Sequence, residues 1–247
     1  LGSQDISGQY LPSFVDLQAF FTFQINERIH VEYLLNYARN RFSFIPEDRT
    51  TDFGLVNFQS RFTVFYEGEE DDQYQSLMNG LSLVHQVNNN LQLKYLTGVY
   101  MMSENEKFDI IGDYFLGEVE TDPGNENLGE VKQELGSGTF HDWARNVLDT
   151  KIYQSAIKGE YLKKKHEVKF GFTYKRELIL DRLSEWERRD SSGYSLPYST
   201  STVELFDVLK PEPLALNSNR YSGYIQDTWK LDDSARVTWN YGIRFQY

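Results

Sequence analysis

The sequence predicts an all-β protein: an antiparallel transmembrane β-barrel with long extracellular loops. Apolar and polar residues alternate with a period of two along several segments, which sends successive side chains to opposite faces of a sheet. Short polar turns alternate with long acidic connections, as in outer-membrane barrels. The chain has 17 Tyr, 17 Phe and 4 Trp, although its mean hydropathy is -0.57. A barrel needs this mixture, because its wall has an apolar band, aromatic girdles and a polar lumen.

The alternation is clearest in three segments. The predicted apolar faces carry Ile29, Val31, Tyr33, Leu35 and Tyr37, then Val168, Phe170, Phe172 and Tyr174, and near the end of the chain Val237, Trp239, Tyr241, Ile243, Phe245 and Tyr247. The residues between them are mostly polar, as His30, Glu32 and Asn36 illustrate. Half-buried sheets of soluble proteins alternate in the same way. Here the apolar face is bulky and aromatic, with Trp and Tyr towards the segment ends, which favours contact with lipid.

The turns organise the chain into hairpins. Short polar connections occur at Asn26-Glu27, Asn88–Asn90, Lys163–Lys165 and Asp232–Ser234. The first of them follows a strand formed by Val15, Leu17, Ala19, Phe21, Phe23 and Ile25. Longer acidic connections run from Glu47 to about Tyr74, from Ser103 to about Arg145 and from Arg188 to about Asn219. Four hairpins predict about eight membrane strands, with short periplasmic turns and long external loops.

Parts of the long connections have the pattern of strands. Phe62–Tyr66 and Phe108–Val119 are expected to extend the sheet above the membrane. In the segment from Arg176 to Arg189, Ile179, Leu183 and Trp186 would also line one face of a helix. Continuation of the preceding strand is the favoured interpretation.

Composition excludes several classes of protein. The chain has 25 basic and 37 acidic residues, a net charge of -12, so it is a poor partner for nucleic acid. It has no cysteine and no apolar run near the roughly 18 residues of a membrane-spanning helix. Leu1–Gln4 lack the features of a signal peptide. Either a signal peptide has been removed or, as we favour, the chain is an internal piece of a longer protein.

Two runs near the end of the chain carry a resemblance to a known family. Tyr221–Leu231 reads YSGYIQDTWKL, and Asn240–Phe245 reads NYGIRF. They resemble the barrel of TonB-dependent outer-membrane receptors, in which a Tyr-x-Gln-Asp-x-Trp hairpin precedes a Tyr-Gly-x-Arg-aromatic strand. Phe108–Gly112 and Trp186–Tyr194 are similar to receptors of the Bacteroidetes type. The hairpin is the specific part, and the remainder is similarity of pattern.

The resemblance implies a function and a set of partners. The family's barrel has 22 strands around a plugged lumen, so residues 1–247 would be a wall segment, with the plug, the TonB-contacting box and the other strands elsewhere. The implied activity is energy-coupled uptake of a scarce or large solute across the outer membrane of a Gram-negative bacterium. The implied partners are outer-membrane lipid and lipopolysaccharide, the TonB complex through the absent plug, and a surface lipoprotein as a further candidate.

Signals of enzyme chemistry are lacking, and no catalytic, cofactor-binding or metal-ligating residue is predicted. His30, His85, His141 and His166 do not have the spacing of a zinc site. No Gly-x-Ser-x-Gly elbow occurs, and no glycine-rich phosphate loop follows a strand.

Two groups of acidic and amide residues are candidates for cation binding. One is the acidic run Glu67, Glu69, Glu70, Asp71 and Asp72, and the other is a looser group, Asp122, Asn125 and Glu126. Calcium needs six to eight oxygen ligands in a fixed arrangement, so a solvated loop bearing like charges is the favoured interpretation. A third hypothesis is that these loops meet divalent cations that bridge lipopolysaccharide.

Two further groups are candidates for contact with a solute. Charged residues expected to face the lumen are Lys158, Glu160, Lys169, Lys175 and Arg244. They either line a path for solute or pair across strands, and the second is favoured because any lumen face is polar. Tyr194, Tyr198 and Phe206 are aromatic loop residues that would either stack on a ligand or anchor the loop. No substrate-binding residue is predicted beyond these candidates, and the substrate stays unknown.

Two other classes of protein fit part of the pattern. A passive porin or structural outer-membrane barrel shares the membrane wall but has no plug. A soluble β-sandwich or lipocalin-like binding module shares the alternation, with the apolar face packed against a second layer.

Overall fold

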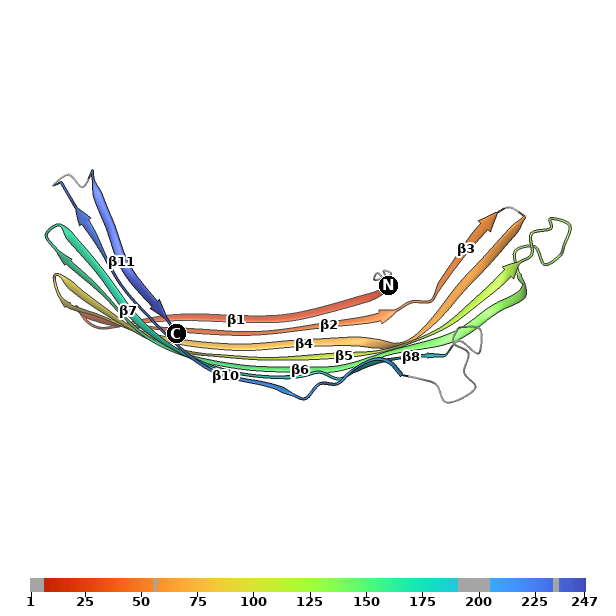
Figure 1. Ribbon diagram of the computed structural model, residues 1–247, viewed down its shortest axis with the longest axis horizontal. Coiled ribbons are helices and arrows are strands. Elements are labelled where there is room, and N and C mark those ends of the chain that lie inside the picture. Colours follow the sequence, from red (N-terminus) through yellow and green to blue (C-terminus); the bar gives the residue numbers. More distant parts are fainter. Residues whose placement is uncertain (1–6, 56, 191–204, 233–235) are drawn as a thin grey trace.

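The computed structural model describes residues 7–55, 57–190, 205–232 and 236–247. Throughout these residues the secondary structure is β, and eleven strands form one antiparallel sheet. The all-β antiparallel prediction is confirmed. Figure 1 shows the sheet as a single curved layer, with the turns at 27–28, 89–90 and 164–165 at one end and the pairing of 49–55 with 58–64 at the other.

Eight strands follow one another across the sheet in chain order. They are β1 (Gly8–Asn26), β2 (Ile29–Pro46), β4 (Phe58–Asn88), β5 (Leu91–Val119), β6 (Val131–Lys163), β7 (His166–Arg182), β10 (Leu214–Lys230) and β11 (Thr238–Gln246). Three short strands lie off this path: β3 (Arg49–Leu55) pairs with β4, and β8 (Glu185–Asp190) pairs with β6 and with β9 (Leu205–Leu209).

The four predicted hairpins are present as antiparallel pairs, β1–β2, β4–β5, β6–β7 and β10–β11. Their turns follow from local chemistry. The Asn26 side-chain oxygen accepts hydrogen bonds from the backbone nitrogens of Arg28 and Ile29, at 2.9 and 3.0 Å. Asn88 has the same role in the β4–β5 turn. Lys164 adopts a positive φ of 54° in the β6–β7 turn, a conformation common in two-residue hairpin loops.

The expectation of long loops in the first two acidic connections is wrong. Strand β4 is continuous from Phe58, and β5 and β6 pair as far as Val119 and Val131. The extra strands expected within these connections are therefore confirmed, but they are longer than predicted. Their charged residues are compatible with a strand because partners lie on neighbouring strands, as with Arg41 and Asp71, whose Nε and Oδ1 are 2.7 Å apart. The β5–β6 connection proper spans 120–130.

The third acidic connection, and the segment from Arg176 to Arg189 that leads into it, are also partly strand. Strand β7 continues to Arg182 and β8 begins at Glu185, which confirms the strand interpretation over the helical one. Strand β9 lies within the connection, and residues 191–204 lie outside the described residues.

The sheet has no second layer over the described residues. The element pairs that make substantial contacts are all hydrogen-bonded neighbours in the sheet. Large apolar side chains are consequently exposed on every one of its eight principal strands. The sheet is also open, because β1 and β11 each have a strand partner on one side in the part of the chain that the structure describes.

Candidate membrane interface

The register brings apolar residues from each of the eight principal strands onto one face, which we call the apolar face. One row of directly paired residues crosses the sheet as Phe23, Val31, Leu83, Tyr95, Ile157, Phe172, Gly223 and Phe245. Every residue of this row is apolar, aromatic or glycine. Exposed fractions of 52% for Ile157, 47% for Phe172 and 56% for Phe245 show that the face is uncovered.

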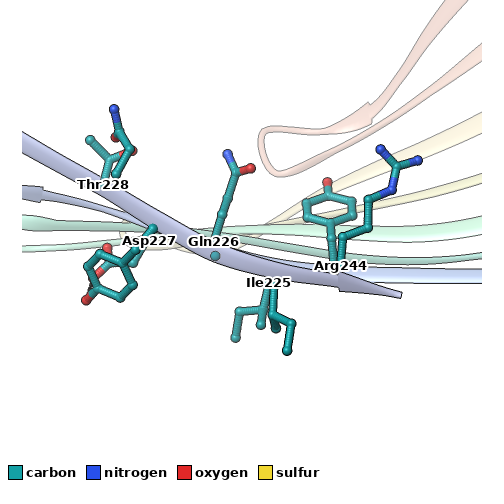
Figure 2. Close-up of a pocket in the computed structure, with 10 residues that line it drawn as sticks. Ile225, Gln226, Asp227, Thr228 and Arg244 are labelled. Carbon is teal, nitrogen blue, oxygen red and sulfur yellow. Dashed lines mark hydrogen bonds between the residues drawn. The ribbon is translucent and has the colours of Figure 1, made fainter. Parts of the chain in front are cut away.

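The opposite face, which we call the polar face, has a different composition. The row one residue away crosses the same strands as Gln24, His30, Val84, Lys94, Lys158, Gly171, Tyr224 and Arg244. Figure 2 shows the alternation in the last hairpin, where Gln226, Thr228 and Arg244 project to one side and Ile225 and Asp227 to the other. The predicted alternation therefore becomes two chemically distinct faces of one sheet.

The apolar face has the extent of a lipid-spanning band. On β2 it runs from Ile29 to Tyr37, nine residues, and a tilted transmembrane strand needs about 9–11. Beyond Tyr37 the same face continues with Arg39 and Arg41. On β2, the change from apolar to charged side chains thus occurs at the distance from the turn that a bilayer would require.

Tyrosine and tryptophan concentrate at the two borders of this band. Near the turns lie Tyr161, Trp229, Trp239 and Tyr241, and at the far border lie Tyr37, Tyr153, Tyr174 and Tyr221. Several of these rings are in contact, with centroids 5.2 Å apart for Tyr174 and Tyr221 and 6.4 Å apart for Trp229 and Trp239. Amphipathic rings at both borders are typical of a membrane barrel.

Polar side chains in the middle of the apolar face form hydrogen bonds with one another. The Tyr33 hydroxyl donates to the Asn79 side-chain oxygen at 2.6 Å. The hydroxyls of Thr97 and Ser155 are 3.2 Å apart on neighbouring strands. Both pairs were missed by reasoning from the sequence, since they depend on register between strands far apart in the chain. Such pairing lowers the cost of placing polar groups in hydrocarbon.

The five charged residues predicted to face a lumen all lie on the polar face. Among them, the Lys169 ammonium is 4.0 Å from a carboxylate oxygen of Glu160 across the β6–β7 pair. Lys175 binds Glu177 on its own strand at 2.6 Å. These contacts favour the interpretation that the charges pair along the wall. Lys158 and Arg244 lie on the same face.

A hollow of about 440 Å³ occupies the middle of the polar face. Gly80 and Gly98 pair directly across β4 and β5, and their missing side chains leave space above the backbone. Residues bordering the hollow include Phe20, Leu34 and Lys94. This hollow was not predicted from the sequence, although two glycines in strand interiors are a signal of a local gap.

Strand β4 divides the acidic run between the two faces, which corrects its assignment to a solvated loop. Alternation places Glu67, Glu69 and Asp71 on the face opposite Glu70 and Asp72. All five carboxylates therefore cannot converge on one cation. No group of three or more His, Asp or Glu residues in the described parts of the chain has a metal-binding arrangement.

The two aspartates of this run have opposite electrostatic environments, beyond the apolar band. Hydrogen bonds from Arg41 lower the pKa of Asp71. Burial, together with the nearby carboxylates of Glu70 and Glu106, raises the pKa of Asp72 to about 7. One oxygen of Asp72 is buried without a hydrogen-bond partner.

The second acidic group stabilises a loop. The Asp122 side chain accepts a hydrogen bond from the Gly124 backbone nitrogen at 2.9 Å, and Asn125 accepts one from Asn127 at 3.0 Å. These are local side-chain to backbone bonds that shape turns. Glu126 lies in the same loop.

The four histidines lie on different strands and do not form a cluster. His141 contacts Asp109 at 2.8 Å, and His166 contacts Asp227 at 2.7 Å. His30 on β2 lies 3.6 Å from a carboxylate oxygen of Glu32, and His85 lies on β4. His30, His141 and His166 each have one carboxylate neighbour, which is a structural pairing of a kind common along sheets.

Two of the three candidate aromatic loop residues, Tyr194 and Tyr198, lie outside the described residues. The backbone of Phe206 belongs to β9, where it pairs with Glu187. Its side chain lies outside the described part of the structure.

Comparisons with known proteins leave the family open. Neither a scan against protein-family models nor a search of curated proteins finds a match to this chain. Among the described residues, no helix has the length and hydropathy needed to cross a membrane.

Proposed function

We propose that this chain forms part of the wall of an outer-membrane TonB-dependent receptor that takes up a scarce or large solute. The observation that carries the proposal is the apolar face, aligned in register across eight strands and bordered by tyrosine and tryptophan. A face of this composition needs an apolar environment, because exposing it to water costs about 25 cal/mol for each Å².

Lipid suits this face better than a second protein layer. The face holds an apolar band with tyrosine and tryptophan at both borders, whereas the core of a sandwich has no reason to end in such girdles. Its central polar groups are paired with one another, as the Tyr33–Asn79 hydrogen bond of 2.6 Å illustrates. This pairing favours a membrane wall over the soluble β-sandwich alternative.

The open edges favour a larger barrel. In lipid, every backbone polar group needs a partner, so strands β1 and β11 require neighbours. In the proposed receptor, further strands of a 22-stranded barrel supply them, and the polar face lines the lumen. Outer-membrane lipid and lipopolysaccharide then contact the apolar face, and the TonB complex acts through a plug outside these residues. A surface lipoprotein is a candidate partner at the extracellular side.

Detergent partition with heat-modifiable gel mobility tests the membrane location. We expect the full-length protein to fractionate with outer membranes and to migrate differently before and after boiling, because a folded barrel resists the detergent of the gel. Recovery in the soluble fraction, with mobility independent of heating, would favour the β-sandwich.

Energised uptake separates a receptor from a passive porin. In cells that depend on this protein for a solute, we expect both a protonophore and deletion of the TonB component to abolish uptake. A porin conducts down a gradient, so uptake that persists under both treatments would contradict the receptor proposal and support the alternative.

A further inference from the structure

Two cations lie side by side on the apolar face, at the border farthest from the turns. Lys151 is on β6 and Arg176 is on β7, where Arg176 pairs directly with Tyr153. Lys151 precedes Tyr153 by two residues and so shares its face. The two cations are therefore diagonal neighbours, whose Cβ atoms are roughly 7–8 Å apart in a regular sheet.

Neither cation has an ion-pair partner within the described residues. The nearest acidic position on this face of β6, Asp149, binds Arg182 at 2.9 Å and accepts a hydrogen bond from Ser103 at 3.0 Å. Lys151 and Arg176 are both exposed. Two neighbouring cations without an ion-pair partner are unexpected in a chain with 37 acidic and 25 basic residues.

The surroundings add further hydrogen-bond donors. Tyr153 is 40% exposed beside the two cations. Asn219 lies opposite Arg176 on β10, and its side-chain oxygen accepts a hydrogen bond from Tyr174 at 2.8 Å. The amide nitrogen of Asn219 consequently remains as a donor. The cluster offers an ammonium, a guanidinium, a phenol and an amide, which together suit a phosphate.

We propose that Lys151 and Arg176, with Tyr153 and Asn219, bind the phosphate group of an anionic membrane lipid. This inference rests on the proposed membrane location, which places the pair where the apolar band ends and lipid headgroups begin. Basic residues at that depth attract anionic headgroups. Arg41 and Arg145 on the same face are neutralised by aspartates, whereas Arg39, at the border of the band on β2, also lacks an ion-pair partner among the described residues.

Native mass spectrometry of the full-length protein, released from detergent micelles and titrated with phosphatidic acid or phosphatidylcholine, tests this proposal. We expect the wild-type protein to bind phosphatidic acid more tightly. The double variant Lys151→Gln/Arg176→Gln should raise the Kd for the first bound phosphatidic acid about tenfold. Lys151→Arg/Arg176→Lys should retain most of the affinity, since it keeps both charges.

The matched control is Lys158→Gln/Lys175→Gln, which removes the same charge from the polar face of the same two strands. This control should bind phosphatidic acid more tightly than phosphatidylcholine, as the wild-type protein does. Equal affinity for both lipids, or an equal loss in the control, would overturn the lipid site alone. A protein that stays soluble without detergent would overturn the membrane location and the lipid site together, so the two failures are distinguishable.

Discussion

At the scale of single residues, Tyr33 and Asn79 show how a polar group on the apolar face obtains a hydrogen-bond partner. Asn79 is an amide on an otherwise apolar face, and the Tyr33 hydroxyl satisfies its oxygen at 2.6 Å. Removing one partner leaves the other unpaired, which costs more than removing both. The stability cost of breaking this pair therefore indicates whether water or hydrocarbon surrounds the apolar face.

We expect Tyr33→Phe to lower the free energy of unfolding in vesicles by about 1 kcal/mol. Asn79→Leu should also be destabilising, because it leaves the Tyr33 hydroxyl without its acceptor. In the Asn79→Leu background, Tyr33→Phe should restore stability, because neither partner is then left unpaired. Urea titrations of the four proteins measure this cycle, and additive effects would contradict the coupling.

Asp72 makes stability depend on pH. Its pKa is raised to about 7, so between about pH 4 and 7 the folded protein binds a proton that the unfolded chain releases, and stability falls as the pH rises. Asp72→Asn should therefore stabilise the protein at about pH 8 and have little effect below about pH 4. Unfolding midpoints measured across this range test the prediction.

Asp71→Asn is the matched control, with the opposite sign. Because Arg41 lowers the pKa of Asp71, its carboxylate contributes stability above the ordinary pKa of an aspartate, and this is lost as the pH falls. The variant should be destabilised at neutral pH and approach the wild type in acid. Parallel pH profiles for the two variants would show that the faces of β4 do not differ as described.

At the scale of elements, the strands and hairpins could be predicted from the sequence, but their lengths could not. Alternation at 29–37 and 168–175 defines the faces, and polar residues such as Asn26 and Asn88 mark the turns. The acidic sequence around Asp71 gave no local sign of a strand, because its stabilising partner Arg41 lies on β2. The Gly80–Gly98 hollow likewise depends on register between strands.

The central part of β6 allows a direct comparison of the two faces within one strand. Ile157 lies in the middle of the apolar face, whereas Gln154 is exposed on the polar face. We expect Ile157→Arg to cost about 2–4 kcal/mol of unfolding free energy in a bilayer, and Gln154→Arg to cost far less. Urea unfolding in vesicles measures both values. Equal costs would contradict the assignment of the faces.

At the scale of the whole molecule, the open single layer implies that its two edge strands have neighbours in the full-length protein. Among the residues that the structure describes, strands β1 and β11 have no strand partner along their outer edges, and such edges pair with further strands when they can. In the full-length protein, we expect the edge amides of β1 to exchange with solvent as slowly as those of central β5. Rapid exchange confined to β1 and β11 would show that the wall ends there.

The account depends most directly on contact between the apolar face and acyl chains. The chain has no cysteine, so single cysteines carrying a fluorophore can report on positions 169, 170, 172 and 173 of β7. We predict that probes replacing Phe170 and Phe172 are quenched by nitroxide lipids, and that probes replacing Lys169 and Thr173 are quenched by aqueous iodide. Iodide quenching at all four positions, without quenching by lipid, would contradict the account.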